Sequence, residues 1–184
     1  MSLYPVTSFF CRGFTLIELL VSLLLFSLGL LGYVALQQQI QTQQLTLVQR
    51  NQGINLVAIM ANQLELNYLA AECYNLGKIQ LGVGDQHSHS CKLDIDAEAR
   101  ARAEEDINQW HRQLQGLQSI AAPLNARGCI ERQKTTNSYS LTLAWQGLKE
   151  HSISLSVCGD GQYADNRLRR IFTYSVNLPG AVSP

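Results

Sequence analysis

Hydrophobic residues dominate one stretch near the start of the chain, from Phe14 to Leu36. Of its 23 residues, 17 are apolar and two are glycine. The four polar residues are Thr15, Glu18, Ser22 and Ser27. A helix of this length is about 34 Å long at about 1.5 Å per residue, which is enough to cross a bilayer core about 30 Å thick. The run therefore predicts a membrane-spanning helix.

Helical periodicity continues beyond the apolar run. Five residues recur at alternating spacings of three and four, as on the apolar stripe of an amphipathic helix: Ile54, Val57, Ala61, Leu64 and Tyr68. No proline interrupts this part of the chain, so we expect one long helix from residue 14 to about residue 70. The upper part of that helix should pack on a soluble domain.

A second helix is predicted over residues 95–118, with Asp94 as its N-terminal cap. Its apolar stripe consists of Ala103, Ile107, Trp110, Leu114 and Leu117. The same helix carries the acidic cluster Glu104-Glu105-Asp106, which resembles a paired-carboxylate site for acid–base chemistry. Because several arginines lie on the same helix, a solvated face with i,i+4 ion pairs is the favoured interpretation.

Strict period-two alternation marks three segments in the last third of the chain: 139–145, 152–157 and 171–178. A shorter strand is expected around Cys129-Ile130. The residues 146–150 between the first two segments are few enough for a hairpin. We therefore predict a three- or four-stranded antiparallel sheet within residues 128–179. Its apolar face would bury the stripe of the long helix, giving an α+β domain with the second helix between.

The five cysteines indicate an oxidising compartment. Cys11 lies near the start of the chain, and the other four form an even set, as in exported domains. Four cysteines permit three pairings. Proximity along the chain favours Cys73–Cys91, closing a local loop, with Cys129–Cys158, tying two strands of the sheet. The other two pairings would cross between loop and sheet.

Charge gives little indication of a strongly charged partner. The whole chain has 14 basic and 14 acidic residues, and without its first 13 residues it would have 13 and 14, a net charge of −1. Such a balance offers no bulk attraction to nucleic acid or acidic lipid. Arg167, Arg169 and Arg170 form a small cluster that could contact DNA phosphates beside Tyr163. A surface that contacts a neighbouring protein explains them equally well, so we do not expect nucleic-acid binding.

Two stretches contain residue types that bind metal ions, but we expect neither stretch to bind a metal ion. His87-Ser88-His89-Ser90-Cys91 places three ligand-type residues on one face of an extended strand, with a fourth ligand needed from Cys73, His111 or His151. An oxidising setting favours a polar loop closed by a disulfide instead. The loop from Asp160 to Asn166 has calcium-type ligands, but its spacing departs from the EF-hand pattern and favours a plain turn.

Glu18 sets the apolar run apart from an ordinary anchor. A charge in the hydrocarbon region costs at least about 2.5 kcal/mol, so an acid there needs a partner. The run contains no Lys, Arg or His. The partner must come from another molecule, such as a free α-amino group of an adjacent subunit exposed by cleavage after Gly13.

Arg12 precedes the run and the next basic residue is Arg50, which favours a cytoplasmic N-terminus. A secretory signal or plain anchor fits the hydropathy but does not explain Glu18.

The sequence Arg12-Gly13-Phe14-Thr15-Leu16-Ile17-Glu18 resembles the class III signal of type IV pilins and pseudopilins. The resemblance implies that prepilin peptidase cuts after Gly13, that Phe14 is then N-methylated, and that Glu18 guides subunits into the filament. The following Ser27-Leu28-Gly29-Leu30-Leu31-Gly32 is similar to minor pilins of the PilV group. The family's pilin fold agrees with the α+β pattern reached above from periodicity.

The resemblance also implies a domain organisation. Residues 1–13 would be the leader peptide, 14–36 the transmembrane half of the first helix and 37–72 its periplasmic half. Residues 73–184 would form the globular periplasmic domain. The protein would wait in the inner membrane and then move to the pilus on the cell surface.

No nucleophile motif, phosphate-binding loop or dinucleotide fingerprint occurs, so we expect neither an enzyme nor a cofactor nor a small-molecule substrate. The favoured function is a minor pilin supporting pilus assembly, twitching motility and adhesion. Its partners would be prepilin peptidase, other minor pilins and the major pilin. Two alternatives are a minor pseudopilin of type II secretion and a filament-borne adhesin or DNA-uptake receptor.

Overall fold

The computed structural model describes residues 13–84, 90–116, 124–134, 137–152 and 155–179. The chain divides into two compact units, Met1–Gln41 and Thr42–Pro184. One helix, α1, runs from Leu16 to Leu66 and supplies residues to both units.

In the first unit, α1 is exposed along its whole length up to Gln41. Its apolar sequence is long and hydrophobic enough to cross a membrane. The serine hydroxyls within it donate to the helix's own carbonyls, Ser22 to Leu19 O at 2.9 Å and Ser27 to Leu24 O at 2.8 Å. These bonds satisfy polar groups that would otherwise be costly in an apolar surrounding.

In the second unit, α1 buries one face against the domain core. The buried residues on this face are Gln49, Gly53, Val57, Met60, Ala61 and Leu64. The predicted stripe is therefore confirmed at its centre, whereas Tyr68 is 44% exposed. The reason is that the α-helix ends at Leu66 rather than near residue 70, and a 3-10 helix, η1 (Tyr68–Tyr74), turns the chain away.

The second helix, α2, spans Ala97–Gly116 and is shorter than the predicted range 95–118, whose last two residues lie outside the described part of the chain. Its predicted apolar stripe is confirmed at Ala103, Ile107, Trp110 and Leu114, and His111 is buried beside it. The N-terminal cap is Asp96, not Asp94, because the Asp96 carboxylate accepts from the backbone N–H of Ala99 at 2.9 Å.

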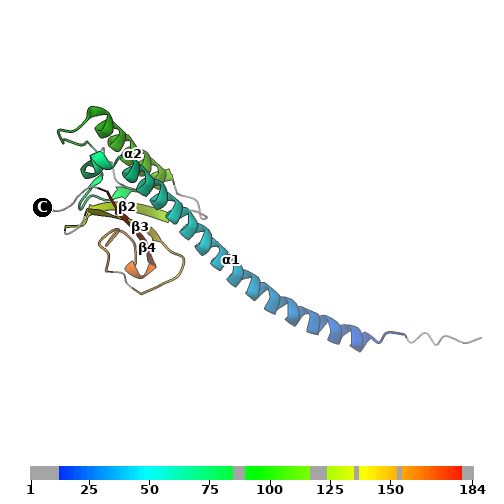
Figure 1. Cartoon of the computed structure of the whole chain (residues 1–184). Coiled ribbons are helices and arrows are strands. Elements are labelled where there is room, and N and C mark those ends of the chain that lie inside the picture. The colour runs from blue at the N-terminus through cyan, green and yellow to red at the C-terminus, as the bar shows by residue number, and fades with distance from the viewer. Residues whose placement is uncertain (1–12, 85–89, 117–123, 135–136, 153–154, 180–184) are drawn as a thin grey trace, which may run out of the picture. The chain divides into compact units, whose positions relative to one another are not determined.

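A four-stranded antiparallel sheet has the order β1-β2-β3-β4. Figure 1 shows β2, β3 and β4 side by side. Its strands are β1 (Leu81–Gly82), β2 (Leu124–Arg132), β3 (Ser138–Gln146) and β4 (Arg169–Asn177). The short β1 falls in a stretch that periodicity cannot identify as a strand, since it has two residues.

The predicted strand 152–157 and the hairpin at 146–150 are wrong. Residues 153–154 lie outside the described part of the chain, but residues 152 and 155–157 have no strand structure. Strand β3 pairs directly with β4, from Ser138↔Asn177 to Gln146↔Arg169. Leu155 is fully exposed and Val157 is 73% exposed, so the alternation there does not mark a buried face. The described residues of 147–152 and 155–168 instead belong to the long connection between β3 and β4, which ends in the 3-10 helix η2 (Asn166–Leu168).

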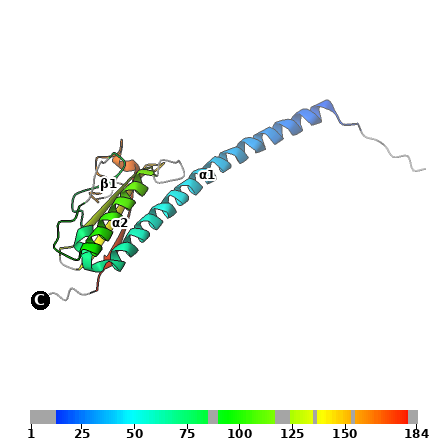
Figure 2. The ribbon, with the colours of Figure 1, turned by 90° about the horizontal axis from the view of Figure 1, so that it is seen from above.

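Both helices of the second unit lie on the same face of the sheet (Figure 2). Side chains from α1, α2 and the strands form one main core there. At Gly128 a Cβ atom would lie 2.4 Å from Trp110 Cη2, so only glycine lets α2 approach β2 this closely. The result is the predicted pilin-like α+β fold, a long N-terminal helix packed on an antiparallel sheet with a second helix.

Candidate functional site

The peptide bond between Gly13 and Phe14 lies in non-helical, exposed backbone just before α1. A Cβ atom at Gly13 would meet nothing within 4 Å, and the Phe14 side chain is 73% exposed. Among the described residues, no element packs over this bond. A peptidase could therefore take the bond into its own active site without unfolding any part of the structure.

Thr15 caps the start of α1. Its carbonyl oxygen accepts from the backbone N–H groups of Glu18 at 3.1 Å and Leu19 at 3.2 Å. Its hydroxyl oxygen lies 3.4 Å from the Glu18 nitrogen, as in a capping box with the Thr-x-x-Glu spacing. The cap belongs entirely to residues after Gly13. Cleavage after Gly13 would leave it in place.

Glu18 lies in the first turn of α1, because the helix begins at Leu16 rather than at Phe14. The N-terminal end of a helix favours a negative charge by about 0.3 to 1 kcal/mol, which offsets only part of the cost of an acid beside hydrocarbon. Among the described residues, no hydrogen-bond or ion-pair partner contacts its carboxylate. The carboxylate is thus available to a cation from another molecule.

Two disulfides join Cys73 to Cys91 and Cys129 to Cys158, the pairing that proximity along the chain favours. The first fastens η1 to the segment before α2. The second fastens β2 to the long connection between β3 and β4. All four sulfur atoms are therefore in disulfide bonds, and Cys73 and Cys91 are not available as thiolate ligands to a metal.

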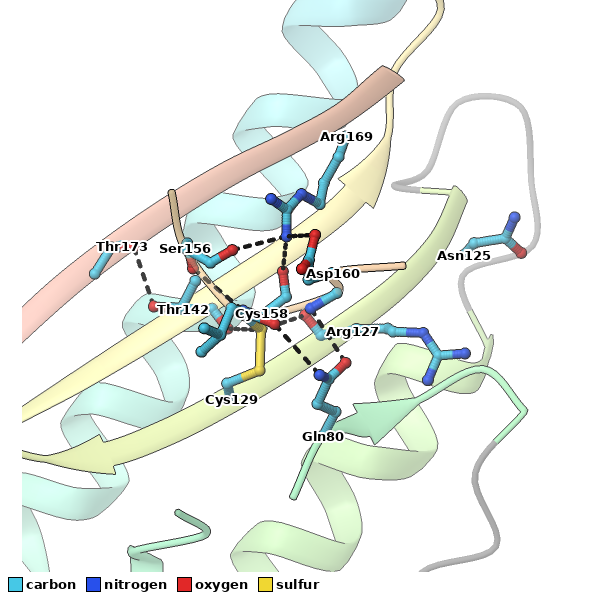
Figure 3. Close-up of a disulfide and its surroundings, with 12 residues drawn as sticks. Gln80, Asn125, Arg127, Cys129, Thr142, Ser156, Cys158, Asp160, Arg169 and Thr173 are labelled. Atoms are coloured by element: carbon cyan, nitrogen blue, oxygen red, sulfur yellow. Dashed lines mark hydrogen bonds and ion pairs between the residues drawn. A yellow bond between two sulfur atoms is a disulfide. The ribbon is translucent and has the colours of Figure 1, made fainter. Parts of the chain in front are cut away.

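Figure 3 shows the second disulfide and the buried Arg169 beside it. The Arg169 side chain is 1% exposed, and its Nη1 donates to Ser156 O at 2.8 Å and Cys158 O at 3.0 Å. Its charge is paired with Asp160 Oδ1 at 3.5 Å. Arg169 thus holds the connecting loop against β4, a role that the sequence did not reveal.

The other members of the basic cluster also have partners within the domain. Arg167 pairs with Asp165 at 2.7 Å and with Glu150 at 2.9 Å, and Arg170 donates to Lys149 O at 2.8 Å. The Tyr163 side chain is buried, and its hydroxyl donates to Asn125 O at 3.1 Å. The three arginines and Tyr163 therefore do not form one open basic surface for DNA.

The loop from Asp160 to Asn166 uses its acids internally. Asp160 Oδ1 accepts from Asn166 Nδ2 at 2.9 Å, and hydrogen bonds from Arg167 lower the pKa of the Asp165 carboxyl. Among the described residues, no group of three or more metal-ligating side chains is found. His87 and His89 lie outside the described residues.

The predicted i,i+4 ion pairing on α2 is confirmed between the exposed side chains of Glu98 and Arg102, which lie 2.6 Å apart. Among the described residues, the acids of the cluster itself have other partners. Glu104 accepts from the backbone N–H of Cys91 at 2.7 Å, and Glu105 pairs with Arg112 at 2.7 Å. Asp106 accepts from the Tyr74 hydroxyl at 2.5 Å. Burial, followed by the bond to Asp106, raises the pKa of Tyr74. Two of these acids thus anchor α2 to the chain before it.

Comparison with known proteins finds a match to a short sequence motif at the start of the chain. The prokaryotic N-terminal methylation motif matches residues 10–34, which include Gly13, Phe14 and Glu18. No curated protein and no solved structure matches the chain. The motif supports the class III signal of the type IV pilin family, and with it prepilin peptidase processing, membrane anchoring and assembly with other pilins. The motif does not distinguish a pilin from a pseudopilin.

Proposed function

We propose that this chain is a minor pilin of the type IV pilus, similar to the PilV group. It is cut after Gly13, methylated on Phe14, and incorporated into the filament or its initiating complex. Such a role makes it a structural protein rather than an enzyme. Its partners are prepilin peptidase, other minor pilins and the major pilin.

The observation that carries this proposal is the arrangement at the start of α1. An exposed Gly13–Phe14 bond, the Thr15 cap and an acid with no partner among the described residues occur within six residues, at the start of an apolar helical segment that is exposed up to Gln41. An ordinary membrane anchor needs only the apolar length. The remaining features suit a helix that is cut at a defined bond and then packs among identical or related helices.

In the proposed organisation, residues 1–13 are the leader, 14–36 cross the inner membrane, and 37–72 continue the helix into the periplasm. Residues 73–184 form the globular periplasmic domain. Its two disulfides suit that compartment, where cysteines become oxidised. On assembly the domain moves with the helix to the pilus on the cell surface.

Glu18 is proposed to recruit the subunit into the filament. Cleavage after Gly13 creates a positively charged α-amino group on Phe14 of each subunit, and methylation leaves that charge in place. A neighbouring subunit's amino group can neutralise Glu18 when the two helices pack at the right axial offset. Because an unpaired carboxylate in hydrocarbon costs a few kcal/mol, this pairing selects one register.

A minor pseudopilin of type II secretion carries the same N-terminal motif, and a deletion strain separates the two functions. We expect loss of twitching motility and of sheared surface filaments, with secretion of type II substrates unchanged. When the deletion strain is complemented, motility should return only if the chain carries Glu18. That result would link the phenotype to assembly. Loss of secretion with normal motility would instead assign the chain to the pseudopilus.

A further inference from the structure

A pocket of about 420 Å³ opens beside the disulfide between Cys129 and Cys158, and both cysteines line it. The neighbours of Cys129 along β2, Gly128 and Ile130, face the helices, so alternation along the strand turns Cys129 to the opposite face of the sheet. The walls of the pocket are the segment before β1 and the connection between β3 and β4, which contributes Val157. A second molecule can therefore approach this disulfide from the face without helices.

The two sulfur atoms of this disulfide differ in their surroundings. Cys129 is half-buried, whereas Cys158 is 2% exposed. In thiol–disulfide exchange a thiolate attacks one sulfur and displaces the other, so Cys129 is the sulfur open to attack and Cys158 is the one displaced. Cys158 Sγ lies 3.6 Å from Thr142 O and 3.8 Å from Arg127 O. A reduced Cys158 thiol would thus have carbonyl acceptors in place.

The other disulfide has a less favourable environment for exchange. Cys73 is 2% exposed and Cys91 is 9% exposed, and both belong to the main core. The Glu104 carboxylate accepts from the backbone N–H of Cys91 at 2.7 Å, which places a negative charge beside this disulfide. Burial and nearby negative charge both disfavour a thiolate. The two disulfides should therefore differ in their rates of reduction.

Two exposed side chains of opposite charge line the same pocket, Lys78 and Glu131. Glu131 lies two residues beyond Cys129 and hence on the same face of β2. Among the described residues, neither charge has an ion-pair partner. Lys78 would attract an approaching thiolate, and Glu131 would repel it. The charge of the incoming thiol should therefore affect the rate of attack.

Noncovalent bonds also hold the connection at this point (Figure 3). Arg169 Nη1 donates to Cys158 O at 3.0 Å, and the backbone N–H of Gly159 donates to Gln80 Oε1 at 3.1 Å. The pairing of β3 with β4 is separate from these bonds. Loss of the disulfide would therefore loosen the connection locally and leave the sheet in place.

We propose that Cys129–Cys158 is a reversible redox site, and that the pocket admits the thiolate of a dithiol protein of the Cys-x-x-Cys class. The thiolate attacks Cys129 Sγ and forms a mixed disulfide. The Cys129–Cys158 bond breaks, and the Cys158 sulfur leaves with the electron pair and takes up a proton. The second thiol of the partner then displaces Cys129, which takes up the other proton. The dithiol is oxidised to a disulfide, and the cysteine pair is reduced to two thiols.

Selective reduction is measured on the full chain in detergent micelles, with Cys11→Ser to remove the thiol of the proposed leader. Dithiothreitol is added without denaturant, thiols are alkylated at intervals, and mass spectrometry of peptides locates them. We expect the Cys129–Cys158 disulfide to be reduced about tenfold faster or more than Cys73–Cys91, because access controls the rate. Cys73–Cys91 is the internal control, since unfolding would expose both disulfides.

The site of attack is tested with a Cys-x-x-Cys protein of the thioredoxin class whose second cysteine is replaced by serine. This protein cannot complete the second step and should be trapped as a mixed disulfide with Cys129. After full reduction by dithiothreitol, amide hydrogen exchange should become faster at Gly159 and stay unchanged at Leu141 and Leu143 of β3.

Variants test the pocket and its charges separately. Ser140 is half-buried and lines the pocket. Ser140→Phe should slow reduction of Cys129–Cys158 about tenfold by blocking access, whereas Ser140→Ala should leave the rate unchanged. With glutathione, whose net charge is negative, Lys78→Gln should slow reduction and Glu131→Gln should accelerate it, each about twofold to fivefold, as expected for exposed charges. With cysteamine, a cationic thiol, both effects should reverse.

Three results would overturn the proposal. The first is reduction of both disulfides at the same rate. The second is a rate that increases in parallel for both disulfides at low urea concentration, because exchange would then require unfolding. The third is a trapped mixed disulfide at a cysteine other than Cys129. The inference goes beyond the proposed function and does not depend on cleavage or methylation, so the two can fail separately.

Discussion

The backbone N–H of Glu18 donates to Thr15, whose carbonyl oxygen lies 3.1 Å away and whose hydroxyl oxygen lies 3.4 Å away. The helix is thus capped by the second residue after the proposed cleavage bond. Its acid and its cap remain together after the leader is removed. The mature chain would enter the filament with the start of its helix already formed.

Replacing Glu18 with alanine is expected to leave cleavage intact and to lower the amount of the protein in sheared filaments at least tenfold. The reason is that the proposed ion pair with a neighbouring α-amino group is lost, and each tenfold corresponds to about 1.4 kcal/mol. Immunoblots of sheared filaments measure the effect, and intact mass verifies processing.

Glu18→Gln and Glu18→Asp are the matched controls for that experiment. Glutamine keeps the shape without the charge and should fail like alanine, whereas aspartate keeps the charge and should retain more incorporation. Normal incorporation of the alanine variant would contradict the proposed role of Glu18.

The mature, unreduced protein should contain no free thiol. Cys73, Cys91, Cys129 and Cys158 are all in disulfides, and Cys11 would leave with the leader. Thiol titration in denaturant tests this count. One free thiol would indicate a retained leader, and two or more would contradict the disulfide pairs.

The disulfides should also contribute measurable stability. The sequence separations are 18 and 29 residues. Loop-closure entropy then gives about 3.2 kcal/mol for Cys73–Cys91 and about 3.6 kcal/mol for Cys129–Cys158. Replacing both cysteines of one pair with alanine should lower the free energy of unfolding by these amounts in urea titrations. A loss below about 1 kcal/mol for either pair would contradict this account.

Arg169→Leu is expected to destabilise the domain by about 2 to 3 kcal/mol, because the carbonyl oxygens of Ser156 and Cys158 lose a buried donor. Arg167→Leu is the matched control. Its side chain is 53% exposed, and exposed ion pairs contribute about 0 to 1 kcal/mol. Equal effects of the two substitutions in urea unfolding would refute the structural role given to Arg169.

The structure also predicts an alkaline loss of stability through Tyr163. Burial raises the pKa of its phenol above the ordinary value of 10.0. Below pH 10 both folded and unfolded chains hold the proton, so the contribution is complete. Above pH 10 the unfolded chain releases it first, and stability falls by about 1.4 kcal/mol per pH unit for this residue.

Tyr163→Phe removes that contribution. Urea unfolding between pH 9 and pH 11 should show a decline that is shallower than in the unaltered protein by about 1.4 kcal/mol per pH unit above pH 10. Parallel declines in the two proteins would show that Tyr163 ionises alike in the folded and unfolded chains.

The helices could be predicted from sequence because their burial follows a regular period. Val57, Ala61 and Leu64 lie on the buried face of α1 as predicted. The ends were less predictable, since the change to a 3-10 helix after Leu66 depends on tertiary contacts such as the bond from Asn67 to Ala99 O at 2.8 Å. Tyr68 continues the apolar period but lies beyond the α-helix.

The segment 152–157 shows the limit of period-two reasoning. Its alternating residues suit a strand, but the neighbouring Cys158 is bonded to Cys129 and the Ser156 carbonyl is bound by Arg169. These two attachments hold residues 155–157 outside the sheet and leave Leu155 exposed. Alternation records which side chains could share a face and carries no information on such attachments.

Within the candidate site, the sequence predicted which residues are chemically unusual but not their local geometry. The missing countercharge for Glu18 is evident from composition, because no basic residue lies between Arg12 and Arg50. The role of Thr15 as a cap required knowing that α1 begins at Leu16. Arg169 and Arg167 are both arginines, so residue type alone could not predict that Arg169 is buried and Arg167 is exposed.

The most direct test of the central claim is the intact mass and N-terminal sequence of the protein recovered from membranes. Our account predicts a mature chain that begins at Phe14 and carries one added methyl group. A chain that begins at Met1, or one cut beyond Leu36, would contradict processing at Gly13. Either result would leave an anchored or secreted α+β domain without the pilin pathway.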